Sequence, residues 1–222
     1  MTWTMIWTMA GVTWARLRRG RALWIGLVIA ALPVVFAYLW AARGRSTDDT
    51  ALMIATTPIL VLLPPLFVAS SIGEELESRT STYLWSRPIA RWAIIAGKLG
   101  ALAPLAIALA LAGWTLAHLV GPHAAPSAAS CLAIGLGCAV VAIAAAAIAL
   151  IAPRHGMALA ITYLLVDSFI GAWPFSLAQV SVTHQVRALA GGDGLAAPAL
   201  ALIAIGAVWA LIGLARVRRL EV

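Results

Sequence analysis

The sequence predicts an all-α integral membrane protein with six transmembrane helices, an N-terminal interfacial helix and a short cytoplasmic helix between spans two and three. Of its 222 residues 63% are hydrophobic, and the mean hydropathy is +0.99, outside the range of soluble domains. Six apolar runs are each long enough to cross the hydrocarbon core, which needs about 20 helical residues. The runs are continuous and do not alternate with polar residues, which excludes a membrane β-barrel. Helices therefore remain as the structure that satisfies the backbone in lipid.

Residues 1–20 precede the spans and form a separate predicted element. Its apolar residues recur at helical spacing and define one face: Trp3, Ile6, Trp7, Ala10, Trp14 and Leu17. A basic cluster from Arg16 to Arg21 closes the segment. Because tryptophan favours the headgroup level, we expect an amphipathic helix lying on the inner membrane surface.

The six spans follow within a single transmembrane domain that covers residues 1–222. They are predicted at 22–42, 51–73, 93–120, 127–152, 157–177 and 198–215. Pro64 and Pro65 each remove a backbone donor from the second span, so we expect a bend there. Small residues crowd the fourth span: Gly135, Gly137, Ala142 and Ala144 to Ala147. Such residues let neighbouring membrane helices approach closely.

The basic residues predict the orientation of the chain. The outer segments hold only Arg43, Arg45 and Arg187, and the other twelve of the fifteen basic residues fall on the inner side. This distribution places both termini in the cytoplasm of a multi-pass protein, which we expect in a bacterial inner membrane. The net charge of +7 thus reflects orientation in the lipid bilayer. No basic aqueous domain exists, so nucleic-acid binding is not expected.

The last outer segment, residues 178–197, predicts a short helix at the outer interface. Leu177, Val180, Val186 and Leu189 form an apolar face, and Gln179, His184 and Arg187 are polar. The glycine-rich stretch Gly191–Gly194 then indicates a turn before the sixth span.

One short segment, residues 72–92, concentrates charge in a chain that is only 10% charged. Three glutamates open it, and Glu75 is spaced to pair with Arg79 one helical turn later. Acidic residues suit the first turn of a helix, and the residue before Pro88 is pushed out of helical geometry. We therefore expect a separate cytoplasmic helix within residues 74–91.

This segment resembles the loop between spans two and three in the membrane subunits of type-2 ATP-binding-cassette (ABC) exporters. The matching residues are Glu75, Glu77, Thr80, Leu84, Pro88, Arg91 and Gly97–Lys98, with Arg79 where the family usually has glycine. The topology of the whole chain is also similar to that family. The resemblance implies a coupling helix that docks in a cleft of a cytoplasmic ATPase. It assigns this contact to Glu74, Glu75, Glu77, Arg79, Thr80, Leu84, Pro88 and Arg91.

The resemblance also implies partners. The only Gly-Lys pair, Gly97–Lys98, lacks the flanking residues of a phosphate-binding loop. ATP and magnesium are therefore expected in a separate ABC ATPase present in two copies, and no cofactor is expected in this chain. Six spans form half of such an exporter, so a second permease copy, identical or related, is expected as well.

A lone acid, Asp167, lies near the middle of the predicted fifth span, close to Tyr163 and Ser168. Insertion of a carboxylate there costs roughly 2.5–3.5 kcal/mol, so it should face protein or water. It either lines the translocation path or a subunit interface, or it only holds helices together. Cys131 and Cys138 are too far apart on their helix to form a disulfide. The histidines are scattered, so no metal site is expected.

Three functions remain open from these observations. An exporter permease that moves an amphipathic or hydrophobic drug, lipid or peptide explains both the spans and the charged segment. A non-transporting assembly factor or a small channel explains the spans alone. An intramembrane enzyme would need a nucleophile with a base, or paired acids, and Asp167 has no such partner in sequence.

Overall fold

A computed structural model of the chain describes residues 2–43, 49–77, 91–120, 125–174, 176–192 and 194–219. Every regular element in these ranges is a helix. The α-helices are α1 (Thr2–Arg19), α2 (Ala22–Ala42), α3 (Asp49–Pro64), α4 (Ser70–Glu77), α6 (Arg91–Val120), α7 (Ala128–Ile151), α8 (Gly156–Ala172), α9 (Val182–Gly191) and α10 (Ala196–Arg219). A π-helical segment, η1 (Pro65–Ala69), and two 3₁₀ turns, η2 (Pro153–His155) and η3 (Ser176–Val180), complete the order.

Six helical stretches among the described residues are long and apolar enough to cross a membrane, which confirms the predicted all-α membrane fold. They are Ala22–Ala42, Leu52–Leu76, Trp92–Val120, Ala128–Ile151, Pro153–Ala172 and Ala196–Arg219. The second extends three residues beyond its predicted inner end, because the helix continues through Glu74 and Glu75, and the third begins one residue earlier, at Trp92.

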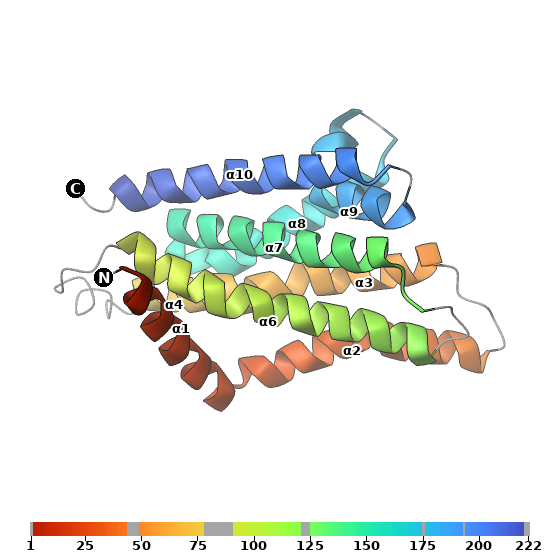
Figure 1. The fold of residues 1–222 in the computed structure, drawn as a ribbon, viewed down its shortest axis with the longest axis horizontal. Coiled ribbons are helices and arrows are strands. Elements are labelled where there is room, and N and C mark those ends of the chain that lie inside the picture. Colours follow the sequence, from red (N-terminus) through yellow and green to blue (C-terminus); the bar gives the residue numbers. More distant parts are fainter. Residues whose placement is uncertain are drawn as a thin grey trace.

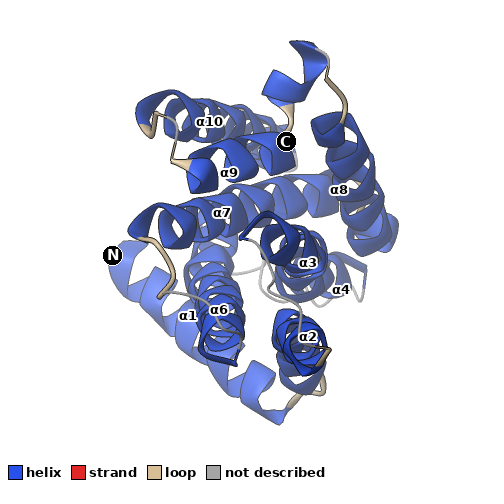
Figure 2. Cartoon of the chain, turned by 90° about the vertical axis from the view of Figure 1, so that its right-hand side faces the viewer, coloured by secondary structure: helices blue, strands red, loops and turns tan. Residues whose placement is uncertain are grey.

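The spans form a bundle with α7 at its centre (Figures 1 and 2). In the most apolar window of each span, 72% of the residues are buried in α7 and 67% in the second span. In the other four spans the buried share is 33% or less, so these spans lie at the periphery of the bundle. Alanines Ala144 to Ala147 are all buried, and Gly137 lies against Val186 of α9. The predicted role of these small residues in close packing is thus confirmed.

Both termini of the chain lie at one end of the bundle, here called the N/C end (Figure 1). The last described turn of α4 and the first turn of α6 also lie there, so both flanks of the charged segment reach this end. The opposite end carries α9 and the start of α3. Residues 78–90 lie outside the described residues, and so does most of the predicted coupling helix.

The second span is one helical rod made of α3, η1 and α4. Pro64 and Pro65 have no N–H to donate, so Leu60 and Val61 lose their usual helical partners. The helix widens directly after them into five π-helical residues, and the Ser70 N–H bonds the Pro65 carbonyl. The proline pair therefore changes the helix type at the point where a bend was predicted.

A new helix beginning at Glu74 is not observed. Glu74 and Glu75 lie within α4, which begins at Ser70 and continues the second span. The expectation of a separate helix over 74–91 was therefore wrong for its start. The helix is unbroken from Ser70 to Glu77, so the acids extend an existing helix.

Residues Thr2–Arg19 form a helix, α1, as the sequence predicted. It crosses the bundle obliquely at the N/C end and packs mainly against α6 (Figure 1). Leu17 packs against the core, whereas Trp7 is 72% exposed and Trp14 is 42% exposed. Two of the predicted apolar residues thus remain available to lipid, and the interfacial position of α1 stays a prediction.

The fifth span differs from the predicted range of 157–177. It ends at Ala172, because Trp173 precedes Pro174 and adopts extended geometry with ψ 143°. It also begins earlier, since η2 joins α8 directly at Gly156. Asp167 consequently lies toward the C-terminal end of the span and not near its middle.

The predicted outer helix is divided into two elements. Ser181 caps α9, with its Oγ accepting a hydrogen bond from the His184 N–H, so a new helix starts after η3. Val186 and Leu189 are buried as predicted, but Leu177 and Val180 belong to η3 and are 68% and 67% exposed. The predicted turn before the sixth span is present, and Gly192 and Gly194 have φ values of 79° and 86°.

Candidate functional site

The candidate site is the N/C end of the bundle, where both flanks of the charged segment meet. Glu75 of α4 and Lys98 of α6 form an ion pair, with 2.7 Å between Lys98 Nζ and Glu75 Oε2. The same Nζ donates to the Ser71 carbonyl at 2.6 Å and to Ser71 Oγ at 3.2 Å. Lys98 is 4% exposed. Its charge is therefore held by three oxygens from one turn of α4.

This pair lies within the membrane-spanning part of α6. Lys98 is seven residues past Arg91, or about 10 Å along the helix axis. A charge at this depth is costly unless it is paired and hydrogen-bonded. Glu75 and Ser71 meet this need, because they are spaced four residues apart and lie on the same face of α4.

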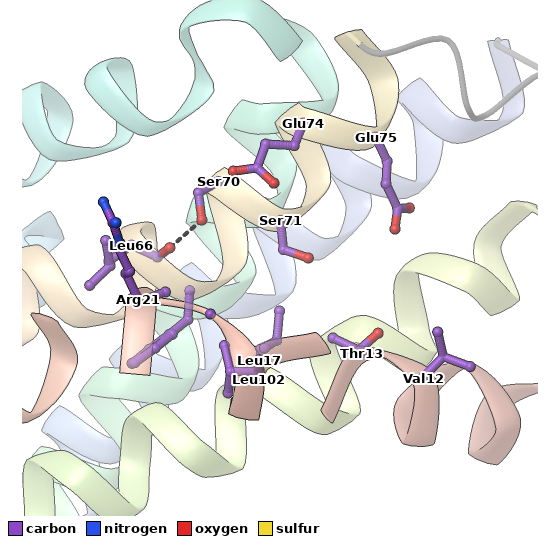
Figure 3. A pocket seen from close by; sticks show the side chains of 13 residues that line it. Val12, Thr13, Leu17, Arg21, Leu66, Ser70, Ser71, Glu74, Glu75 and Leu102 are labelled. Atoms are coloured by element: carbon purple, nitrogen blue, oxygen red, sulfur yellow. Dashed lines mark hydrogen bonds between the residues drawn. The ribbon is translucent and has the colours of Figure 1, made fainter. Parts of the chain in front are cut away.

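A cavity of about 440 Å³ opens beside the ion pair (Figure 3). Its apolar lining includes Leu17, Phe67 and Leu102. Its polar lining includes Ser70, Ser71, Glu74 and Glu75 from α4 and Arg21 from the joint between α1 and α2. The Ser70 hydroxyl bonds the Leu66 carbonyl within the helix, as the dashed line in Figure 3 marks. The cavity thus combines an apolar lining with charges of both signs.

A second contact joins α4 to the turn between spans four and five. Gly73 lies directly against the Pro153 carbonyl, and a Cβ atom at Gly73 would be 2.7 Å from that oxygen. Arg154 and His155 follow in η2 and line a shallow pocket with Glu74. The start of the charged segment is therefore in contact with α6 on one side and with η2 on the other.

Asp167 makes a different site near the C-terminal end of α8. Its carboxylate accepts hydrogen bonds from the Val182 and Thr183 backbone N–H groups, each at 3.0 Å. The hydroxyls of Ser181 and Thr183 donate to Oδ2 at 3.0 Å each. Asp167 is 5% exposed. The acid thus binds the N-terminal turn of α9, where a negative charge is favourable.

The two residues predicted with Asp167 lie apart from this cluster. Tyr163 accepts a hydrogen bond from Trp209 Nε1 at 3.3 Å and packs edge to face against its ring. Ser168 is half-buried, and its hydroxyl donates to the Leu165 carbonyl of its own helix. Whether any of the three lines a translocation path or a subunit interface remains a prediction.

The structure places only part of the predicted coupling set. Glu74 is exposed and Glu75 is half-buried. The backbones of Glu77 and Arg91 lie in α4 and α6, with side chains that are not described. The other predicted contacts lie outside the described residues: Arg79, Thr80, Leu84 and Pro88. The pairing of Glu75 with Arg79 therefore stays a prediction, whereas the bond of Glu75 to Lys98 is observed.

Two residues of the N/C end site were not predicted, Lys98 as an ion-pair partner and Ser71 as its acceptor. A signal existed in the sequence. Lys98 is a single lysine several residues inside a run that is otherwise apolar, a position where a charge needs a protein partner. Among the described residues, no group of three histidine, cysteine, aspartate or glutamate side chains could hold a metal ion.

The fold and the buried charges define an all-helical, multi-pass membrane protein. The sequence model of the ABC-2 family transporter proteins matches residues 13–170. The matched region covers more than half of the chain, and the protein belongs to this family of membrane transport permeases. Members of the family generally work with ATPase subunits. A comparison with curated proteins gave no match.

Proposed function

We propose that this chain is the membrane subunit of an ATP-driven exporter in a bacterial inner membrane. Two copies of it pair with two copies of a cytoplasmic ABC ATPase, which binds ATP and magnesium. The observation that carries the proposal is the arrangement at the N/C end. Both flanks of the charged segment converge there on a buried ion pair, so an ATPase bound to that segment would act on spans two and three together.

The orientation supports the same proposal. The flanks of the charged segment share an end with both termini, and the excess of basic residues there favours a cytoplasmic position for that end. A soluble ATPase would meet Glu74, Glu77 and residues 78–90 on this side. Glu75 would contribute less to such a contact than predicted from the sequence, because its carboxylate binds Lys98.

The cavity at the N/C end supports an amphipathic cargo. An apolar lining with charges of both signs suits a molecule with a hydrophobic body and a polar head. The cavity lies at the joint between α1 and α2, so a cargo resting in the inner leaflet would reach it sideways. Hydrophobic drugs, lipids and apolar peptides share this chemistry.

The test is co-expression with the P-loop protein of the neighbouring reading frame, followed by purification through the permease. The wild type is expected to retain the ATPase. The double variant Glu74→Lys/Glu77→Lys should insert normally but lose most of the bound ATPase, since it reverses two charges that are predicted to contact the partner. The matched control is Asp48→Lys/Asp49→Lys, which makes the same charge change at the opposite end of the chain's second span.

Transport is measured as ATP-dependent uptake of a fluorescent amphiphile into inside-out vesicles. Uptake that needs both proteins and stops in the Glu74→Lys/Glu77→Lys variant supports the proposal. Full ATPase retention by that variant, or a wild-type permease that purifies without any ATPase, contradicts it. The second outcome would favour a channel or an assembly factor.

A further inference from the structure

The ion pair between Lys98 and Glu75 is an unusual choice for holding two helices together. A buried ion pair contributes little net stability, because the cost of removing both charges from water offsets their attraction. A methionine and a leucine would fill the same space at no such cost. The geometry of the pair indicates what it supplies besides stability.

The geometry fixes the position of α6 relative to α4 in two directions. Lys98 Nζ bonds the Ser71 carbonyl at 2.6 Å and the Glu75 carboxylate at 2.7 Å, two groups one helical turn apart. Sliding α6 along α4 by one residue would break at least one of these bonds, and so would rotating it. Apolar side chains would allow such movement, since dispersion contacts have no preferred direction.

The pair also joins the two sides of residues 78–90, the middle of the charged segment. Glu75 is three residues before residue 78, and Lys98 is eight residues after residue 90. On the other side of α4 lies the π-helical segment Pro65–Ala69, where the regular α-helical hydrogen bonding of the second span is interrupted. The α4 turn is therefore joined to α6 by an ion pair and to α3 by a segment of weaker helical order.

We propose that Lys98 is a positioning residue that ties both flanks of the charged segment into one unit. A push on residues 78–90 then moves α4 and the inner half of α6 together, and η1 takes up the change relative to α3. Without the tie, the same push would separate the two flanks and would not reach the outer half of the bundle. This inference rests on the proposed function, since it assumes that an ATPase acts on the segment.

The experiment follows the movement of the outer end in the complete complex of permease and ATPase. Spin labels are placed at Leu119→Cys and Leu200→Cys, which are 78% and 64% exposed on α6 and α10. Leu119 is next to the last residue of α6 and Leu200 is in the second turn of α10, and these ends of the two helices lie opposite the N/C end. The native Cys131 and Cys138 are replaced by alanine in every variant. The distance distribution is recorded without nucleotide and with trapped ADP-vanadate.

Four proteins are compared, and each has an expected result. The wild type should show a nucleotide-dependent change in the distance distribution. Lys98→Met should bind the ATPase and hydrolyse ATP while the shifted population falls at least tenfold. Lys98→Arg, which keeps the charge and the donors, should retain the shift. The double variant Glu75→Leu/Lys98→Met should be as stable as the wild type and yet lack the shift.

The double variant separates positioning from stability. If the pair only stabilised the fold, an apolar replacement would restore both the stability and the shift, and the proposal would be overturned. The proposal would also be overturned if Lys98→Met showed the same nucleotide-dependent change in the distance distribution as the wild type. Loss of ATPase binding in Lys98→Met would overturn it as well, because Lys98 is 4% exposed and lies seven residues past Arg91 in the third span. A wild type with no bound ATPase contradicts the proposed function itself, which keeps the two failures distinct.

Discussion

Replacing Asp167 with alanine should detach the N-terminal turn of α9 from α8. The carboxylate accepts hydrogen bonds from two backbone N–H groups, those of Val182 and Thr183, and from two hydroxyls. The hydroxyls of Ser181 and Thr183 keep a second acceptor after the change, because both also bond the carbonyl of residue 167. Among the bonds observed, the two N–H groups have no second acceptor. The loss of stability should therefore come mainly from these two groups.

The magnitude follows from these two donors. A buried polar group left without its partner costs about 1–3 kcal/mol, so the Asp167→Ala variant should lose about 2–5 kcal/mol of stability. For a chain of this size 1 kcal/mol corresponds to a shift in the melting temperature of about 2–4 °C, so the shift should be on the order of 10 °C. Asp167→Asn keeps one acceptor oxygen and should lose roughly half as much.

The assay is thermal unfolding in detergent, followed by a dye that becomes fluorescent on reaction with thiols. The buried Cys138 reports unfolding, since its side chain is 0% exposed in the folded chain. Hydrogen exchange then locates the damage, and the amides of Val182 and Thr183 should exchange faster. Ser168→Ala is the matched control and should change stability by less than about 0.5 kcal/mol, because its hydroxyl bonds only its own helix.

An unchanged melting temperature in Asp167→Ala would refute this reasoning. Unchanged exchange at the start of α9 would do so as well, even if the protein were destabilised elsewhere. A variant that stays fully stable and loses only transport would instead support the alternative prediction that Asp167 lines the translocation path.

Two further predictions concern packing and thiol reactivity. Gly73→Ala should destabilise the protein by about 1–3 kcal/mol, because the added Cβ would be 2.7 Å from the Pro153 carbonyl. Gly100→Ala meets nothing within 4 Å and should instead stabilise α6 by up to about 1 kcal/mol in the same thermal assay. In the folded protein a maleimide should modify the half-buried Cys131 much faster than the buried Cys138. Equal rates, read from mass spectra of timed samples, would show that α7 is not the central helix.

Much of the fold could be predicted because its signals are local. The six spans follow from run length and apolarity, which are properties of consecutive residues. The end of the fifth span could have been placed better by the same kind of reasoning, since Pro174 marks it directly. The cap at Ser181 was also visible as a serine before a helical pattern. Pro174 and Ser181 are therefore local signals for the end of the fifth span and the start of α9.

The partners of the buried charges could not be predicted in this way. Ser71 and Lys98 are 27 residues apart, and Asp167 and Thr183 are 16 residues apart. Burial rules state that each charge needs a partner, but they do not say which side chain will supply it. Glu75 had a reasonable local partner in Arg79, and the structure instead gives it Lys98 from the next span.

The amino-acid sequence alone determined that this chain is a six-span helical membrane protein with its charge concentrated on one short segment. It did so because crossing a bilayer depends on the length and apolarity of each run, without reference to the others. Only the tertiary structure decided that Lys98 binds Glu75 and that Asp167 caps α9. Those contacts depend on which helix faces which and in what register, and that is set by packing among small residues along the whole bundle.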